Sequence, residues 1–224
     1  MTSSDASEAH SLTWLFTTSC NRTSAETSNI FAMLISVSSR DDPNYDPAGG
    51  YWLGGVWAPT NLAGVKGLCA LGYHEHAREA VYKYLDGMCR VESDPAYGSI
   101  WECYAPEAYR PASTEYNTLS RGEFVGWSGV APITMLIENI IGLEFRADEN
   151  QVIFRLNSRE KCGLENMMFG DNKISVVCTH YEPFKGKTLI RTSAEKPFKL
   201  KVVTKYLWYP VELSVPAGEN QFEI

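Results

Sequence analysis

The sequence predicts an α+β protein in which the helices come first along the chain and the strands last. Apolar residues recur at helical spacing within residues 59–142, whereas after Asp148 they alternate with polar residues. Because the two patterns are segregated along the chain, we expect separate helical and sheet layers rather than alternating crossovers. The sequence divides accordingly into a poorly specified leader, residues 1–40, a helical part, residues 41–147, and an antiparallel β-layer, residues 148–224.

Three helices are predicted, over residues 59–72, 74–91 and 128–142. Pro59 is a favoured first-turn residue and Ser128 is a candidate N-cap, while glycines close the first and third segments. The third segment is apolar on nearly all sides, so we expect it to be buried on more than one side.

Four rows of alternating apolar residues predict strands in the last third of the chain. Turn-forming clusters separate them, at residues 170–172, 183–186 and 216–218. Together these features predict an antiparallel layer of about four or five strands. The rows are Val152/Phe154/Leu156, Ile174/Val176/Cys178, Phe198/Leu200/Val202 and Val211/Leu213/Val215.

Composition and charge exclude several classes of protein. Hydrophobic residues make up 44% and charged residues 21%, as in a globular domain with a core. The 27 acidic residues outnumber the 20 Lys and Arg, giving a net charge of −7, so we expect no nucleic-acid partner. No apolar run approaches the roughly 20 residues of a membrane helix, and the N-terminus lacks a secretory signal pattern. We therefore expect no membrane partner and a cytoplasmic location.

The six cysteines are scattered, without a CxxC pair or a histidine at ligand spacing. This pattern disfavours structural zinc and favours free buried thiols in a reducing compartment. His74 and His76 are two residues apart and should lie on different helix faces, which argues against a metal site. We expect neither a metal nor a cofactor.

Two irregular segments hold most of the candidate binding residues. The first, residues 41–59, contains four glycines and three prolines beside its aromatic side chains. Indole faces pack against the C–H face of sugar rings, so aromatic loops that converge beside a carboxylate suit a saccharide pocket. Ordinary packing of aromatic residues between helix ends is the alternative. The aromatic residues are Tyr51, Trp52 and Trp57 in the first segment, and Trp101, Tyr104 and Trp127 in the second, residues 92–127.

Glu102 stands between Trp101 and Cys103, where a buried carboxylate without a partner would be costly. One interpretation is a general acid or base in an aromatic cleft, as glycoside hydrolysis requires. The other is a structural carboxylate that caps a helix or pairs with an arginine while Trp101 fills the core. We interpret Cys103 as a packed thiol and Ser128 as a helix cap, because neither has the sequence context of a nucleophile.

Four motifs occur in an order that resembles the trehalase-like glycoside hydrolases. The run GGYWLGGVWAPTN at residues 49–61 is similar to the family signature GGYWRGPVWxPTN, and a Gly-Tyr-His helix start follows at 72–74. Residues 100–107, IWECYAPE, resemble the motif WENYxPE, and residues 124–129, FVGWSG, resemble F-x-GWSG. The group with the greatest similarity is family 63, including its mannosylglycerate-hydrolase-like members. The resemblance extends from Asp41 to the C-terminus.

This resemblance implies a six-hairpin (α/α)6 toroid, of which the chain would be the C-terminal part, a partial toroid followed by a small antiparallel β-layer. The family hydrolyses glycosides with inversion by means of two acidic residues, and the match places the general base at Glu102. The general acid would lie far upstream of the GGYW loop, where Asp5 and Glu8 stand without a matching motif. The residues that would bind the sugar are Tyr51, Trp52, Trp57, Trp101 and Trp127.

The sequence departs from the family pattern at two positions. Leu53 stands where many members have arginine, so a polar substrate contact is lost or supplied elsewhere, and Cys103 replaces a frequent asparagine. We expect the C-terminal fragment of an inverting glycoside hydrolase that carries the general-base loop and acts on an oligosaccharide or small glycoside. The alternatives are a non-catalytic carbohydrate-binding or interaction remnant and an unrelated α+β domain. Helices left uncovered in a partial toroid would favour self-association.

Overall fold

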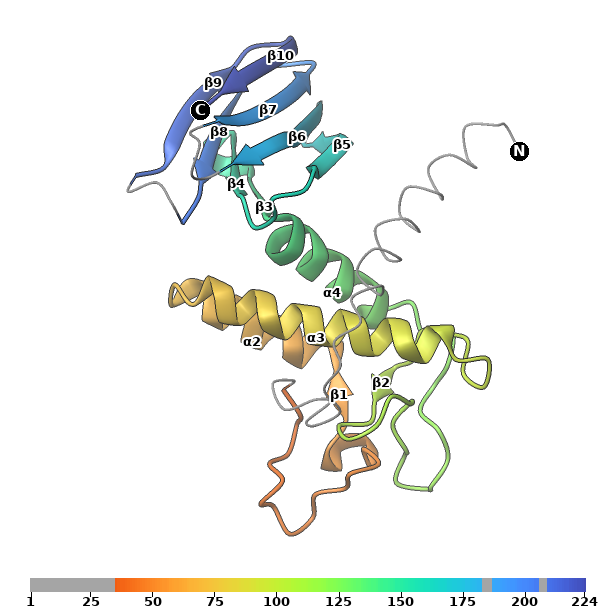
Figure 1. Ribbon diagram of the computed structural model, residues 1–224. Coiled ribbons are helices and arrows are strands. Elements are labelled where there is room, and N and C mark those ends of the chain that lie inside the picture. The colour runs from red at the N-terminus through yellow and green to blue at the C-terminus, as the bar shows by residue number, and fades with distance from the viewer. Residues whose placement is uncertain (1–34, 183–186, 206–208) are drawn as a thin grey trace, which may run out of the picture. The chain divides into compact units, whose positions relative to one another are not determined.

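The chain divides into two compact units, Met1–Met135 and Leu136–Ile224. The predicted leader lies mostly outside the described residues, together with the two upstream acidic residues, and so does the predicted turn at 183–186. A computed structural model describes residues 35–182, 187–205 and 209–224 (Figure 1).

The first unit contains two long helices that agree with the sequence prediction. α2 starts directly after Trp57 and has Pro59 in its first turn. α3 is amphipathic, with one buried apolar face and an exposed Glu79–Lys83 ion pair. α2 packs against both α3 and α4. The bounds in this unit are η1 Tyr51–Leu53, β1 Val56–Trp57, α2 Ala58–Ala70, α3 His74–Ser93, β2 Cys103–Tyr104 and α4 Trp127–Met135.

The third predicted helix is present, but its winding changes along its length. α4 is followed directly by six residues of π-helix, η2 Leu136–Ile141. Pro132 lies inside α4, where it cannot donate the usual hydrogen bond to the carbonyl four residues earlier. The segment is expected to be buried on more than one side, and this is only partly met, because Val130 is 65% exposed and Ile133 is 49% exposed. Self-association through this face stays a prediction. No described helix combines the length and the apolar character needed to cross a bilayer.

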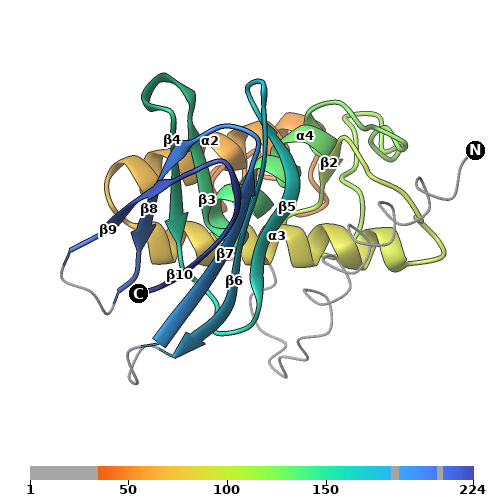
Figure 2. The ribbon, with the colours of Figure 1, turned by 90° about the horizontal axis from the view of Figure 1, so that it is seen from above.

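The second unit is built from two four-stranded sheets (Figure 1, Figure 2). One has the strand order β10-β7-β6-β5 and is antiparallel throughout. The other has the order β3-β4-β8-β9 and contains one parallel pair, β4 with β8. The bounds are β3 Leu143–Arg146, η3 Ala147–Glu149, β4 Gln151–Arg155, β5 Cys162–Phe169, β6 Asn172–Glu182, β7 Lys187–Ala194, β8 Phe198–Val203, β9 Val211–Val215 and β10 Gly218–Glu223.

The apolar rows predicted from the sequence supply the buried faces of these sheets. In β6 the residues Ile174, Val176 and Cys178 are buried, and β4 and β8 bury their predicted rows in the same way. Phe145 of β3 contacts Phe169 of β5, with ring centroids 5.8 Å apart, so side chains from the two sheets share one apolar layer. Burial of each large apolar side chain contributes about 1.5–3 kcal/mol, which makes this layer the main source of stability in the unit.

Two expectations about the architecture are wrong. The chain is not part of a trehalase-like, six-hairpin (α/α)6 toroid, because the described residues form ten strands in three sheets and only three α-helices. The expected single antiparallel layer is instead two sheets with one parallel pair. Helical periodicity ends at Gly142, and the irregular segment between α3 and α4 interrupts any succession of helical hairpins. The alternating pattern beyond Gly142 therefore produces sheets, and these contain more strands than the four apolar rows predicted.

Gly142, between η2 and β3, offers a sharp test of this packing. Its φ is 90°, and a Cβ added there would collide with the carbonyl oxygen of Arg155. Gly170, in the turn between β5 and β6, has a φ of 62° and open space around it. Both alanine substitutions strain the backbone, but only Gly142→Ala forces a clash. It should lower the free energy of unfolding by about 1–3 kcal/mol more than Gly170→Ala. Urea denaturation of both variants checks this, and equal losses would contradict it.

Candidate functional site

Strands β1 and β2 bring the two aromatic segments together. The ladder between them joins residues almost fifty positions apart in the sequence, a long-range contact that local periodicity does not reveal. The glycine-rich loop immediately before β1 and Glu102, immediately before β2, consequently lie on neighbouring chain segments. The two antiparallel pairs are Val56 with Tyr104 and Trp57 with Cys103.

The loop before β1 holds Tyr51 in an unusual backbone conformation. The φ angles are 108° at Gly49, 44° at Gly50 and 60° at Tyr51. Glycine adopts such angles freely, but at a tyrosine they cost on the order of 1–2 kcal/mol. The Tyr51 N–H donates to the Ser113 carbonyl over 2.7 Å, and the Gly50 N–H donates to Ser113 Oγ over 3.0 Å. Strain of this kind is common at functional sites, where the surrounding contacts fix one side chain.

The strained loop directs the Tyr51 hydroxyl to Glu102. The O–H donates to Glu102 Oε1 over 3.1 Å. Glu102 is half-buried, and within the described residues no group hydrogen-bonds to its second carboxylate oxygen. The protein thus orients the carboxylate through one oxygen and leaves the other available to a water molecule or a ligand.

The main chain of Glu102 is fixed independently of its carboxylate. Its N–H donates to the Arg121 carbonyl over 2.8 Å. Its carbonyl accepts a hydrogen bond of 3.0 Å from Ser128 Oγ and a longer one of 3.5 Å from Trp127 Nε1. Ser128 is fully buried inside α4, so it anchors the Glu102 segment rather than capping the helix as the sequence suggested. The sequence signal for this role is weak: a small polar residue in a mostly apolar helix.

Four of the five predicted aromatic residues form one cluster beside Glu102. The rings of Trp52 and Trp57 are stacked, with centroids 4.1 Å apart and an interplanar angle of 6°. Tyr51 meets both of them edge-on, and Trp127 lies tilted against Trp57 at 6.1 Å. Trp57 is buried, whereas Trp52 is 55% exposed and Trp127 is 43% exposed. The cluster therefore has a rigid buried base and two indoles that reach solvent.

Trp101, the fifth predicted aromatic residue, packs elsewhere. Its ring meets Tyr97 edge-on at 6.3 Å and lies against Gly122. Its indole N–H is buried without a hydrogen-bond partner among the described residues. Trp101 thus contacts a different set of residues from the four clustered rings, although it is adjacent to Glu102 in sequence.

Burial shifts the pKa values of several groups around the site. It raises the pKa of Tyr51, and the carboxylate of Glu102 that accepts its hydrogen bond raises it further. Burial also raises the pKa of Cys103 to about 12, which keeps this thiol protonated and agrees with its interpretation as a packed side chain. Across the part of the chain that the structure describes, no three His, Cys, Asp or Glu side chains gather in a way that could hold a metal ion.

Four further residues with polar groups stabilise the loops, and the sequence did not single them out. Glu107 accepts a hydrogen bond from the Tyr45 hydroxyl over 3.1 Å and pairs with Arg40 at the same distance. The buried side chain of Asn61 donates to the Trp57 carbonyl over 2.8 Å. Asn61 and Glu107 belong to the motifs that resemble the glycoside hydrolases, so part of each motif serves to hold its loop.

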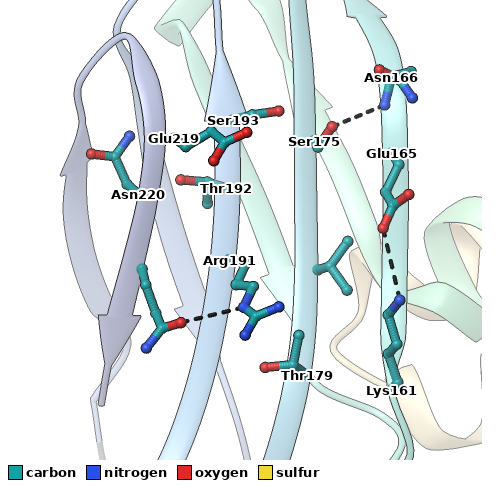
Figure 3. A pocket seen from close by; sticks show the side chains of 12 residues that line it. Lys161, Glu165, Asn166, Ser175, Thr179, Arg191, Thr192, Ser193, Glu219 and Asn220 are labelled. Carbon is teal, nitrogen blue, oxygen red and sulfur yellow. Dashed lines mark hydrogen bonds and ion pairs between the residues drawn. The ribbon is translucent and has the colours of Figure 1, made fainter.

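A hollow lies on the β10-β7-β6-β5 sheet of the second unit. Polar side chains from these strands line a volume of about 560 Å³, and Figure 3 shows how they lie. Three of its charged groups bond to their neighbours: Lys161 pairs with Glu165 at 3.8 Å, and Arg191 Nε donates to Gln221 over 3.3 Å. No aromatic side chain lines it. The Glu102 site has an available carboxylate oxygen and exposed indoles, so it is the better candidate for ligand binding of the two.

The Tyr51–Glu102 contact can be tested by titration without a ligand. Glu102→Gln removes the negative charge beside the phenol, so the pKa of Tyr51 should fall, yet stay raised above its ordinary value because burial is the largest single cause of the shift. Tyr45 and Glu107 supply a matched control, since their hydrogen bond has the same length of 3.1 Å. Glu107→Gln should lower the pKa of Tyr45 and leave that of Tyr51 unchanged.

The measurement is a pH titration followed by NMR of ¹³C-labelled tyrosine rings, assigned with Tyr51→Phe and Tyr45→Phe. A Tyr51 signal that titrates identically in the wild-type protein and in Glu102→Gln would show that the two groups do not interact in solution.

Comparison with known proteins identifies a distant relative. No known protein family matches the sequence, and no solved structure matches it. An uncharacterized protein of Borreliella burgdorferi is 28% identical over 181 residues, which cover 78% of this chain and 34% of the relative. The chain thus spans about a third of the length of this curated relative. The functional interpretation consequently rests on the geometry of the site and on the motif resemblance.

Proposed function

We propose that the Glu102 site binds a saccharide and that Glu102 acts there as the general base of an inverting glycoside hydrolase. The observation that carries the proposal is the Tyr51–Glu102 hydrogen bond of 3.1 Å beside the exposed indole of Trp52. It combines an oriented carboxylate with an open aromatic surface. Glycoside hydrolysis requires both features where the general base activates the attacking water.

The motif resemblance supports the proposal through its spatial arrangement. The segment 49–61 supplies Tyr51, the segment 100–107 supplies Glu102, and the segment 124–129 supplies Ser128. Hydrogen bonds join the first and the third of these residues to Glu102. Segments that are distant in sequence and similar to one enzyme family therefore converge on a single residue, Tyr51 at the carboxylate of Glu102 and Ser128 at its main-chain carbonyl. This support is local and does not depend on the toroid that the fold excludes.

The aromatic cluster suits a pyranose ring. One face of Trp52 is covered by Trp57, which fixes its orientation, while more than half of its surface remains open. A fixed indole presents a flat apolar surface to the C–H face of a sugar with little loss of side-chain entropy. Leu53, 44% exposed beside it, extends the apolar surface where related enzymes have arginine.

In the proposed reaction, Glu102 takes a proton from a water molecule as that water attacks the anomeric carbon. A general acid must protonate the departing oxygen, and in inverting enzymes it lies about 6.5–9.5 Å from the base. The sequence offers no residue that matches this acid, so the proposal assigns the general base alone.

A non-catalytic saccharide-binding site is the second candidate. The observation that favours it is the hydrogen bonding of Glu102: among the described residues its carboxylate bonds to Tyr51, and no second carboxylate bonds there. Under this alternative, Glu102 binds sugar hydroxyls and the exposed indoles bind the faces of sugar rings, but no reaction is catalysed. Binding and hydrolysis experiments together separate the two candidates.

Saccharide binding should depend on Trp52. We expect Trp52→Ala to weaken binding of an array-selected glycan about tenfold, because stacking on an aromatic ring contributes about 0.5–1.5 kcal/mol beyond area burial. Tyr209→Ala is the control, since Tyr209 is 83% exposed and lies in the other unit. Calorimetric titration measures both affinities. Equal affinity in the wild-type protein and Trp52→Ala would place the sugar elsewhere.

Hydrolysis should be visible with glycosyl fluorides, whose fluoride departs without a general acid. The chain should hydrolyse one anomer of a matching fluoride to the sugar of opposite configuration, while alkyl glycosides react poorly or not at all. Glu102→Gln should lower the fluoride rate at least about 100-fold, the scale of general-base catalysis. NMR of the first-formed anomer gives the stereochemistry. Sugar binding without hydrolysis of any glycosyl fluoride would support the non-catalytic binding site and contradict the hydrolase. Undiminished turnover by Glu102→Gln would exclude Glu102 as the general base.

A further inference from the structure

Cys162 and Cys178 face each other across the first residue pair of strands β5 and β6. They are direct partners in the antiparallel register. Direct partners in such a ladder point to the same face of the sheet, with Cα atoms about 4.5–5.5 Å apart. This separation falls inside the range of about 4.4–6.8 Å that a disulfide bridges. The backbone therefore already holds the two thiols at a spacing that a disulfide can span.

The two thiols differ in their access to solvent. Cys178 is buried in the apolar layer, whereas Cys162 is half-buried at the start of β5, which is an edge strand. The contacts of both thiols are weak: Cys162 Sγ donates to the Ile141 carbonyl over 3.6 Å, and Cys178 Sγ donates to the His180 carbonyl over 3.4 Å. Rotation of either thiol toward the other gives up little hydrogen-bond energy. A small oxidant can reach Cys162 first.

The second unit contains no other cysteine that could compete for either thiol. Of the six cysteines in the chain, these two are the ones that fall within Leu136–Ile224. Both are free thiols in the structure. We propose that Cys162 and Cys178 form an oxidation site, in which a small-molecule disulfide converts the facing thiols into a cross-strand disulfide that joins β5 to β6. This inference is independent of the proposed sugar site.

The reaction consists of two thiol–disulfide exchanges. The Cys162 thiolate attacks one sulfur of oxidised glutathione, the glutathione S–S bond breaks, and one glutathione thiolate leaves. The Cys178 thiolate then attacks the Cys162 sulfur of the mixed disulfide and releases the second glutathione. Two electrons pass from the protein to the oxidant, and the two thiol protons end on the two reduced glutathione molecules. Burial raises the pKa of Cys162 to about 11, so the first attack should be slow at neutral pH.

The bond would reinforce a weak point of the sheet. Register between β5 and β6 shifts between Leu164 and Met167, so the start of β5 is separated from the regular part of the ladder by a bulge. The turn at Gly170 ties the two strands at their other end. A disulfide at Cys162 and Cys178 would close the hairpin at both ends and limit fraying of the edge strand.

The test compares the native full-length chain with the urea-unfolded chain. Each is incubated with oxidised glutathione, the remaining thiols are alkylated, and peptides are identified by mass spectrometry. We expect a Cys162–Cys178 cross-linked peptide to dominate in native buffer and the six thiols to pair indiscriminately in urea. Full alkylation of both cysteines in the native chain, or their predominant pairing with other cysteines, would overturn the proposal.

A melting experiment adds an independent readout. Oxidised wild-type protein should melt at least about 5 °C higher than the reduced protein, because the bond closes the hairpin. Cys178→Ser should abolish this difference, and Cys89→Ser, a change of another buried thiol in the first unit, should keep it. An oxidation-dependent shift that persists in Cys178→Ser would show that a different bond causes it, and the proposal would then fail.

Discussion

Burial of the Trp57 indole is the constraint on which the candidate site depends. The ring is 1% exposed, supports the stacked ring of Trp52, and belongs to the residue that pairs with Cys103 in the β1–β2 ladder. A buried indole N–H needs an acceptor, and it donates over 3.2 Å to the carbonyl of Tyr51. Tyr51 is the residue whose hydroxyl reaches Glu102. One side chain thus couples the buried cluster, the strained loop and the carboxylate.

The sequence predicted the local elements well, because each has a strong periodic signal. The apolar stripe of α3 and the proline at the start of α2 place both helices within a few residues of their observed bounds. The missed strands have weaker signals. β7 buries Thr188, Thr192 and Ala194 beside Ile190, so its inner face does not read as an apolar row. β5 contains a bulge that breaks its alternation, and β10 is largely exposed.

The error about the toroid has a different physical origin. The four resembling motifs specify loops and helix starts, and these segments contain the residues that meet at Glu102. Global architecture depends on how the remaining elements pair, and the eight strands after Gly142 lie outside those motifs. A local resemblance can therefore place a site without fixing a fold. Long-range contacts such as that between Ser128 and Glu102 leave no periodic trace in a sequence, so the sequence indicates a helix cap at Ser128 and not an anchor.

The site is ordered before any ligand arrives, and this determines what could bind there. Both main-chain polar groups of Glu102 are satisfied internally, and one carboxylate oxygen is oriented by Tyr51. Trp52 is already held in place by Trp57. A ligand that stacks on Trp52 would lose its own freedom but would order few protein groups, so less of the interaction energy would be offset by entropy. A ligand that fits this site would therefore place an apolar ring face on the indole of Trp52 and donate a hydrogen bond from a hydroxyl group to the second carboxylate oxygen of Glu102.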